Sequence, residues 1–453
     1  MNLLKFLKVL SQANNTKVQK RQSTLQSTTH LSWIEHESTR EEEDSFVIKQ
    51  DNQLQSEELD LEVTTKHENS SSSFVCMTSA YNENSGPQSS ASTLLICPLL
   101  SKAVKNITTD NSSDFVNGKE SDATKKKVAP LTISEYGCAT GGSSLAPLHA
   151  ICKQIDNDGK KIEINVIMND LPLNDWDVLS ETLDPIKHCF KNLEFKKSSM
   201  YDEGVVTKNT LHIGYSCFAQ HWLSVGSPTT FPADGSSSIW PQQLPTSCIE
   251  TKNSWAEAAM NDWATFLDRR FDELVYGGHL VIVIQASRND GTLSENFANT
   301  LMKVKEGMIL DNTLSRYEAS KMTMPEYPKT EKEILAPFES EPNSSRWDIE
   351  EMVFTELECP ILKQWKAMST AAATTTTNNT RRTTSTSGDG DASVVVKKQI
   401  GFCRSFMDSS LTSCVGKDKG EMFWERVATF VGNDTEALAG NFSVVSLMLR
   451  KKK

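Results

Sequence analysis

Short runs of aliphatic residues bounded by turn-forming residues recur between positions 131 and 285. Such runs are typical of buried β-strands, because a strand covered on both faces has no solvent-facing side. Four strands are predicted on this basis, at 131–136, 162–168, 210–216 and 279–285. A fifth segment, 441–449, alternates apolar and polar residues and is predicted to be an edge strand.

A long amphipathic helix is predicted between the third and fourth strands. In segment 254–275 the apolar residues recur at the spacing of one helix face, and they are Trp255, Ala259, Trp263, Phe266, Leu267, Phe271 and Leu274. Gly277 and Gly278 are predicted to end this helix and turn the chain into the next strand. Strands that alternate with helices predict an α/β fold, a doubly wound and mostly parallel sheet with helices on both faces.

Two polar, low-complexity stretches flank or interrupt these elements. Residues 1–73 are rich in Gln, Ser, Thr, Asn and Glu and are predicted to be a disordered tail. Residues 369–392, which read STAAATTTTNNTRRTTSTSGDGDA, are predicted to be a disordered insertion. The first 30 residues are basic and free of acidic side chains, which is typical of an organelle-targeting segment and also of a solvated tail. We expect a cytoplasmic protein, with organelle targeting as the alternative.

Composition narrows the classes of function. The 453 residues carry a formal net charge of −12, which argues against a nucleic-acid partner. No apolar run approaches the roughly 18 residues that span a membrane, so no membrane partner is expected. The ten cysteines include no CxxC pair, which favours buried thiols in a reducing compartment over a zinc site or a disulfide framework. A homodimer stays open as an alternative to a monomer.

The most informative stretch follows the first predicted strand and opens a helix. From Ile133 to Leu145 it reads ISEYGCATGGSSL. A glycine turn there lets a ligand approach the backbone closely at the carboxyl end of the sheet. Glu135 disfavours a phosphate and suits a cationic or hydroxyl-bearing ligand. The dinucleotide pattern GxGxxG is not met, because Ala139 replaces its second glycine. A plain tight turn is the alternative interpretation.

A second polar element follows the second predicted strand. The residues Asn169-Asp170-Leu171-Pro172 place a carboxylate at the strand end, where it can accept hydrogen bonds from both ribose hydroxyls of a nucleoside. The alternative interpretation of Asp170 is a helix N-cap, a common role for aspartate. Two such elements at consecutive strand ends indicate a nucleoside site more strongly than either does alone.

These and other motifs match one known family in the same order along the chain. The matching segments are Tyr81 to Gln88, Gly137 to Leu145, Asn169 to Pro172, Ser199-Met200-Tyr201, Asn209 to His212, His221 to Ser224 and Asp262 to Gly278. Together they resemble the SABATH carboxyl methyltransferases, a family that includes salicylate and jasmonate methyltransferases. The resemblance runs with interruptions from about Phe74 to the C-terminus.

The resemblance implies a methyltransferase domain over 74–453 that uses S-adenosylmethionine. It also implies a helical cap over the acceptor pocket, expected at about 225–253 and 290–398. The expected cofactor-binding residues are Tyr81, Glu135, Gly137, Cys138, Asp170, Leu171, Ser199 and Met200. The expected substrate-binding residues are Gln88, Phe218, His221 and Trp222.

This chain departs from the family pattern at several positions. Ser143 replaces the usual asparagine of the glycine turn, and Met200 replaces an aromatic residue, which leaves a softer apolar contact for adenine. Phe218 replaces a frequent tyrosine and removes a hydroxyl donor. The segment Met322 to Pro325 lacks the polar ligands with which some members hold Mg²⁺, so no metal is expected.

The implied reaction is methylation of the carboxylate of a small organic acid, which becomes its methyl ester. A carboxylate has a pKa of roughly 4, so it is ionised at neutral pH and needs no catalytic base. Gln88 and Trp222 can each donate an N–H that aims the carboxylate, while His221 either lines the pocket or is structural. Methylation of a heterocycle nitrogen, as some members of the family perform, is the main alternative. A nicotinamide-dependent oxidoreductase and a non-catalytic binding protein are further alternatives.

Overall fold

The computed structural model describes residues 77, 81–109, 129–159, 161–224, 239–240, 249–287, 295–359, 363, 367, 388–434 and 441–453. The predicted tail at 1–73 and residues 369–387 of the predicted insertion lie outside these residues. Residues 388–392, which were also assigned to the insertion, instead form the start of a helix, α13.

The described residues form a seven-stranded, mostly parallel sheet in the order β3-β2-β1-β4-β5-β7-β6. The strands are β1 (Leu131–Tyr136), β2 (Ile164–Asp170), β3 (Asn192–Lys197), β4 (Leu211–Cys217), β5 (Leu274–Gln285), β6 (Trp347–Glu358) and β7 (Asn441–Lys451). Strands β1 to β5 pair in parallel, whereas β7 is antiparallel to both β5 and β6. The carboxyl ends of β1, β2 and β4 therefore open on one edge of the sheet.

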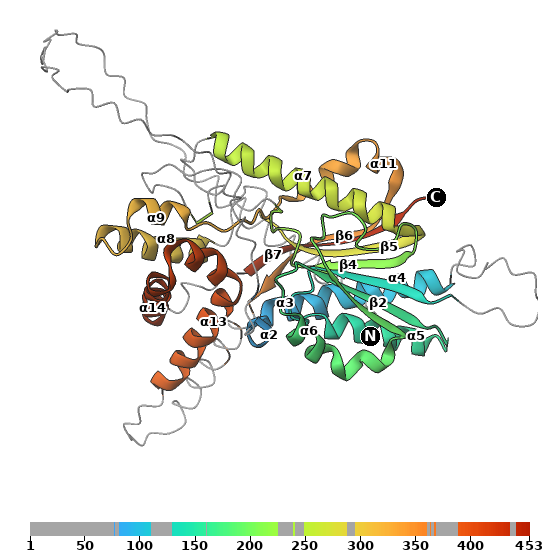
Figure 1. The fold of residues 1–453 in the computed structure, drawn as a ribbon, viewed down its shortest axis with the longest axis horizontal. Coiled ribbons are helices and arrows are strands. Elements are labelled where there is room, and N and C mark those ends of the chain that lie inside the picture. The colour runs from blue at the N-terminus through green and yellow to red at the C-terminus, as the bar shows by residue number, and fades with distance from the viewer. Residues whose placement is uncertain are drawn as a thin grey trace, which may run out of the picture. The chain divides into compact units, whose positions relative to one another are not determined.

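Helices cover both faces of this sheet, which confirms the doubly wound prediction (Figure 1). On one face lie α4 (Cys97–Thr109), α5 (Leu145–Asn157) and α6 (Trp176–Leu183), and on the other lies α7 (Ile249–Glu273). Alternate residues of β5 serve the two cores: Val281 packs toward α4 and α5, and Leu280 packs toward α7. A strand buried on both faces reads as a continuous apolar run, which is why β5 was visible in the sequence.

The shorter elements connect or extend this framework. They are α2 (Tyr81–Asn84), α3 (Gly86–Ala91), the π-helix η1 (Ser92–Ile96), the 3₁₀-helices η2 (Asp184–Cys189) and η4 (Ala336–Glu339), α10 (Glu331–Leu335) and α11 (Asn343–Arg346).

A separate hydrophobic cluster forms a helical cap. Its helices are α8 (Glu295–Leu310), α9 (Arg316–Lys321), α13 (Gly388–Val415) and α14 (Lys417–Asn433), joined by Ile239 and Trp240. The cap thus continues past the expected end at 398, since α13 and α14 share its core. Part of the expected cap range belongs elsewhere, because β6 lies in the sheet.

Two further expectations differ from the structure. Strand β7 lies between β5 and β6 and is not an edge strand. Helix α7 ends at Glu273 and β5 begins at Leu274, so Gly277 and Gly278 lie within a strand and do not end the helix. They occupy an irregular stretch, where the register between β4 and β5 shifts and Gly277 has φ +77°. The glycine pair therefore marks a bulge.

Candidate active site

One cavity opens at the carboxyl ends of β1, β2 and β4. Eight of the twelve predicted site residues line it, from both the cofactor and the acceptor sets: Tyr81, Gly137, Asp170, Leu171, Ser199, Met200, Phe218 and Trp222. The other four, Gln88, Glu135, Cys138 and His221, are buried but do not line this cavity. Phe218 and Trp222 line the same cavity as the predicted cofactor residues, so the predicted acceptor and cofactor subsites are parts of one cavity.

The glycine turn folds tightly at the end of β1. The backbone N–H groups of Gly137 and Cys138 both donate to the carbonyl of Asn169, at 2.9 and 3.2 Å. Gly137 has φ +77°, and a Cβ added to it would lie 2.4 Å from the Cβ of Ala219. Only glycine fits this position, because a side chain would be strained and would collide with the turn after β4.

Asn82 clamps the glycine turn from helix α2, a role that the sequence analysis did not assign. Its Oδ1 accepts hydrogen bonds from the Thr140 hydroxyl at 2.7 Å and the Gly142 N–H at 2.9 Å. Its Nδ2 donates to the Thr140 carbonyl and to the Thr182 hydroxyl, both at 2.9 Å. Helix α2 therefore holds in place the glycine turn, whose residues Gly137, Ala139 and Ser143 line the cavity.

Asp170 is the last residue of β2 and lines the cavity. Its Oδ2 accepts the Ala139 N–H at 2.6 Å and its Oδ1 accepts the Leu171 N–H at 2.8 Å. The next helix, α6, begins at Trp176 and is capped by Asp175, whose carboxylate accepts the Val178 N–H. The N-cap interpretation of Asp170 is therefore wrong, and its carboxylate keeps lone pairs for a ligand.

Two acidic groups lie close together under the cavity. Burial raises the pKa of Glu135 to about 7 and the pKa of Asp170 to about 6. The Tyr215 hydroxyl donates to Glu135 at 2.7 Å. Burial also raises the pKa values of Tyr81 and Cys138, so both side chains are neutral at physiological pH. The site is thus poised to gain negative charge when a cation or a hydrogen-bond donor arrives.

The loop after β3 carries Ser199 and Met200 to the cavity and is tied to α7. The Arg270 guanidinium, fully buried, donates to the Met200 carbonyl at 2.9 Å and pairs with Glu273 at 2.8 Å. It also stacks on the ring of Tyr136, 3.8 Å from the ring centroid, and the Tyr136 hydroxyl donates to Glu273 at 2.6 Å.

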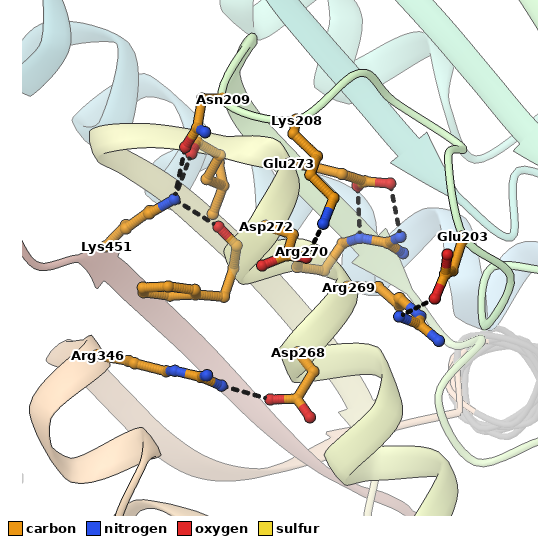
Figure 2. A network of polar contacts seen from close by, with 12 residues as sticks. Glu203, Lys208, Asn209, Asp268, Arg269, Arg270, Asp272, Glu273, Arg346 and Lys451 are labelled. Atoms are coloured by element: carbon orange, nitrogen blue, oxygen red, sulfur yellow. Dashed lines mark hydrogen bonds and ion pairs between the residues drawn. The ribbon is translucent and has the colours of Figure 1, made fainter.

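Figure 2 shows Arg270 and Glu273 side by side at the end of α7. Exposed ion pairs surround them, among them Arg346 with Asp268 and Lys208 with Asp272. The adenine side of the predicted cofactor site is therefore anchored by a buried ion pair. Exposed pairs add little stability to this anchor.

Trp222 lies at the boundary between the cavity and the cap. The Tyr201 hydroxyl donates to the Trp222 carbonyl at 3.0 Å, which links the loop after β3 to this segment. The Trp222 ring packs against Phe406 of α13, with ring centroids 6.4 Å apart. Within the described residues, the Trp222 indole N–H makes no hydrogen bond. It is thus available to a ligand.

His221 is buried beside a carboxylate that the sequence analysis did not identify. Its Nε2 lies 3.7 Å from the Oε2 of Glu326, and the Oε1 of the same carboxylate accepts the Trp240 indole N–H. Burial and the charge of Lys329 lower the pKa of His221 to about 3, so its ring is neutral. Burial raises the pKa of Glu326 to about 7. Because the Glu326 segment pairs with Trp222 across 100 residues of sequence, no local motif revealed it.

The expected absence of a metal site stays a prediction. Met322 and Met324 are buried in the cap core and present no ligand atoms that Mg²⁺ prefers. Among the described residues, no group of three or more His, Cys, Asp or Glu side chains could hold a metal ion. In the same part of the chain, no helix has both the length and the apolar character that crossing a membrane requires.

The fold and the cavity define a class of protein. A solved structure of loganic acid methyltransferase with S-adenosylhomocysteine superposes with a TM-score of 0.64 at 18% sequence identity, covering 84% of this chain and 99% of that one. The fold is therefore that of a methyltransferase. Within this class, the chain belongs to the family of S-adenosylmethionine-dependent carboxyl methyltransferases, whose model matches residues 76–452.

The relatives of this chain include proteins named for carboxylate acceptors and proteins named for xanthine acceptors. Salicylate carboxymethyltransferase of Clarkia breweri is 26% identical over 220 residues, 46% of this chain and 59% of that protein. A probable 7-methylxanthine methyltransferase of Theobroma cacao is 20% identical over 278 residues, 57% of this chain and 73% of that protein. The chain thus spans somewhat more than half of the length of the first relative, and the family includes both oxygen and nitrogen acceptors.

Proposed function

We propose that this protein transfers a methyl group from S-adenosylmethionine to the carboxylate of a small organic acid. The observation that carries the proposal is the single cavity that joins the predicted cofactor residues to Trp222. Family membership supports both the cofactor and the reaction type. It gives no support to the nicotinamide alternative.

The residues at the sheet edge fit S-adenosylmethionine. Asp170 can accept the ribose hydroxyls, since each of its oxygens already holds one backbone N–H and keeps a further lone pair. Glu135 gives the site a second buried acid that suits a positively charged ligand. Leu171 and Met200 offer apolar sides to adenine. When bound, the cofactor supplies an electrophilic methyl group.

The acceptor side fits an acid that is already ionised. The Trp222 indole N–H can donate to one carboxylate oxygen, since Trp222 lines the cavity. The amide N–H of Gln88, which is buried and does not line the cavity, stays a predicted second donor. The neutral His221 is a poor base at its lowered pKa, and none is needed because the carboxylate is ionised. Catalysis then rests on alignment and the exclusion of water, which can supply roughly 7–11 kcal/mol.

Turnover with a panel of acids tests the proposal. The purified protein is incubated with methyl-labelled S-adenosylmethionine and aromatic, fatty, terpenoid and indolic acids, with xanthine and 7-methylxanthine as nitrogen acceptors. Methyl esters are expected from at least one acid. If only the xanthines are labelled, the nitrogen alternative replaces this proposal. If S-adenosylhomocysteine binds but no acceptor is labelled, the protein is a non-catalytic binder.

Replacing Trp222 by Phe tests the acceptor anchor. The change keeps most of the ring but removes a hydrogen bond to a charged group, worth about 1.5–3 kcal/mol, so kcat/KM for the acid should fall roughly 10- to 150-fold. The affinity for S-adenosylhomocysteine should not change. Trp263→Phe is a matched control, because its indole donates to the Ile334 carbonyl in the core under α7 and does not line the cavity. An equal loss in both variants would refute the anchor.

A further inference from the structure

The glycine turn contains a strained residue at the cavity. Ala139 lines the cavity and has φ +47°, which lies in the left-handed region. This conformation brings the Cβ of an L-residue close to the following carbonyl oxygen, so it strains alanine and leaves glycine unstrained. Ala139 stands where the dinucleotide pattern has its second glycine. Other contacts must therefore stabilise the turn at this position.

Strain of this kind is concentrated at the cavity. Of the four non-glycine residues with positive φ in the described part of the chain, Asn209 and Asn312 belong to a residue type that tolerates this conformation. The other two, Ala139 and Phe218, both line the cavity. Strained backbone persists only where the surrounding contacts over-determine it, and it clusters at functional sites. The contacts that hold Ala139 are thus candidates for a functional role.

Both backbone polar groups of Ala139 are held by side chains from the end of β2 and the loop before α6. The Ala139 N–H donates to the Oδ2 of Asp170 at 2.6 Å, and the Ala139 carbonyl accepts a hydrogen bond from the Nδ2 of Asn174 at 2.7 Å. A residue held at both its donor and its acceptor cannot change φ without breaking one of these bonds. Asn174 and Asp170 together therefore fix the conformation of Ala139.

Asn174 is itself well fixed. It is buried, it lines the cavity, and its own N–H donates to the Leu171 carbonyl at 3.0 Å, which closes a turn. The next residue, Asp175, caps α6 with its own carboxylate, so the Asn174 side chain is not the helix cap. Within the described residues, the Asn174 side chain makes one hydrogen bond, the one to the Ala139 carbonyl.

Resting on the cofactor of the proposed function, we propose that Asn174 is a positioning residue for S-adenosylmethionine. By holding the Ala139 carbonyl, it keeps the Ala139 N–H on Asp170 and so fixes the carboxylate that accepts the ribose hydroxyls. Asn174 thus replaces the conformational freedom that a glycine at 139 would supply. Without Asn174, Ala139 relaxes toward negative φ and its N–H turns away from Asp170.

A rescue experiment on S-adenosylhomocysteine binding tests this assignment. Asn174→Ala should raise the dissociation constant about tenfold, the scale of the strain in one left-handed alanine. Ala139→Gly should bind within about twofold of the wild type, because glycine adopts a positive φ without strain. The double variant should also bind within about twofold of the wild type, because its turn no longer needs the amide.

Asn82→Ala is the matched control for the rescue. Asn82 is another asparagine that clamps the same turn, but it bonds Thr140 and Gly142. Ala139→Gly should therefore not restore the affinity that Asn82→Ala loses. With an acid that the wild type methylates, Asn174→Ala should raise KM for S-adenosylmethionine about tenfold and leave kcat and the KM for the acid within about twofold. A general loosening of the fold would lower kcat as well.

Each outcome decides the role of Asn174. If Asn174→Ala binds like the wild type, or if the double variant binds as weakly as Asn174→Ala, the positioning role is refuted. If Asn174→Ala fails to fold while the double variant folds and binds, the rescue supports the role. If neither folds, Asn174 is structural and the role is refuted.

The failure of the proposed function looks different. The binding assay needs no acceptor, so a lack of methyl esters from every acid would refute carboxyl methylation and leave the role of Asn174 standing. A wild-type protein that does not bind S-adenosylhomocysteine would refute both.

Discussion

Affinity for S-adenosylmethionine should rise steeply with pH, because two buried acids must ionise when it binds. Glu135 and Asp170 have pKa values of about 7 and about 6 in the ligand-free site. The cofactor carries positive charge and donates ribose hydroxyls, so the complex favours both carboxylates. At pH 6 only about one site in 20 has both groups ionised, whereas at pH 8 nearly all do. The dissociation constant should therefore be about 20-fold larger at pH 6 than at pH 8.

Isothermal titration calorimetry in two buffers of different ionisation enthalpy measures this linkage. Binding should release about 1.4 protons at pH 6 and about 0.1 at pH 8, as follows from the same two pKa values. In Glu135→Gln the amide oxygen can still accept the Tyr215 hydroxyl, and the pH dependence should shrink to about twofold, which is the share of Asp170. The neighbouring Tyr81 and Cys138 are neutral over this range, since their pKa values are raised. An affinity that is flat between pH 6 and 8, or an uptake of protons, would refute the reasoning.

Three further variants test the supports of the site. Asn82→Ala removes three hydrogen bonds to the glycine turn and one to Thr182 of α6. It should lower the free energy of unfolding in urea by about 2–4 kcal/mol; a loss below about 0.5 kcal/mol would contradict the clamp. Arg270→Lys keeps the charge but loses the forked contact to Glu273 and the Met200 carbonyl. We expect the free energy of unfolding to fall by about 1–3 kcal/mol and S-adenosylhomocysteine to bind more weakly. Unchanged binding would show that the Arg270–Glu273 pair does not support the cofactor loop. The pKa of Glu326 is raised to about 7, so the folded state binds its proton more tightly than the unfolded state, and stability falls as pH rises from about 4.5 to about 7. The free energy of unfolding of Glu326→Gln, measured in urea, should therefore rise relative to that of the wild type by about 2–3 kcal/mol between pH 5 and pH 8. A difference between the two proteins that is constant over this pH range would exclude the linkage.

The sheet was predictable where its strands are buried on both faces. Strands β1, β2, β4 and β5 are apolar runs, but the edge strands β3 (NLEFKK) and β6 (WDIEEMVFTELE) were missed. Edge strands carry charges on their exposed sides, which breaks the apolar run and resembles a loop. The same mixed pattern in β7 suggested an edge, yet β6 covers it. The start of α13 was missed because it reads Gly388-Asp389-Gly390-Asp391, and glycine and aspartate have low helix propensity.

A site residue was predictable where the local motif that contains it also indicates its place in the fold. Asp170 is the last residue of β2 and Met200 follows β3, and the structure places both at the cavity. Asn82 was within a recognised motif, but its role depends on contacts about 60 residues away in the turn. The contacts of Glu326 with His221 and Trp240 depend on how distant segments of the chain meet. Single-sequence patterns record local spacing and do not record which distant segments meet.

The close approach of Gly137 to Ala219 restricts how this protein and its relatives can diverge. A Cβ at 137 would meet the Ala219 methyl group at 2.4 Å even with no ligand present. The glycine is therefore retained for contact between two turns of the same chain, and its presence carries little information about which cofactor is used. Residue 137 is restricted to glycine whatever side chain stands at 219, because a φ of +77° strains any L side chain even where space is free. Glycine is therefore expected at this position across homologous sequences, whatever molecule each enzyme methylates.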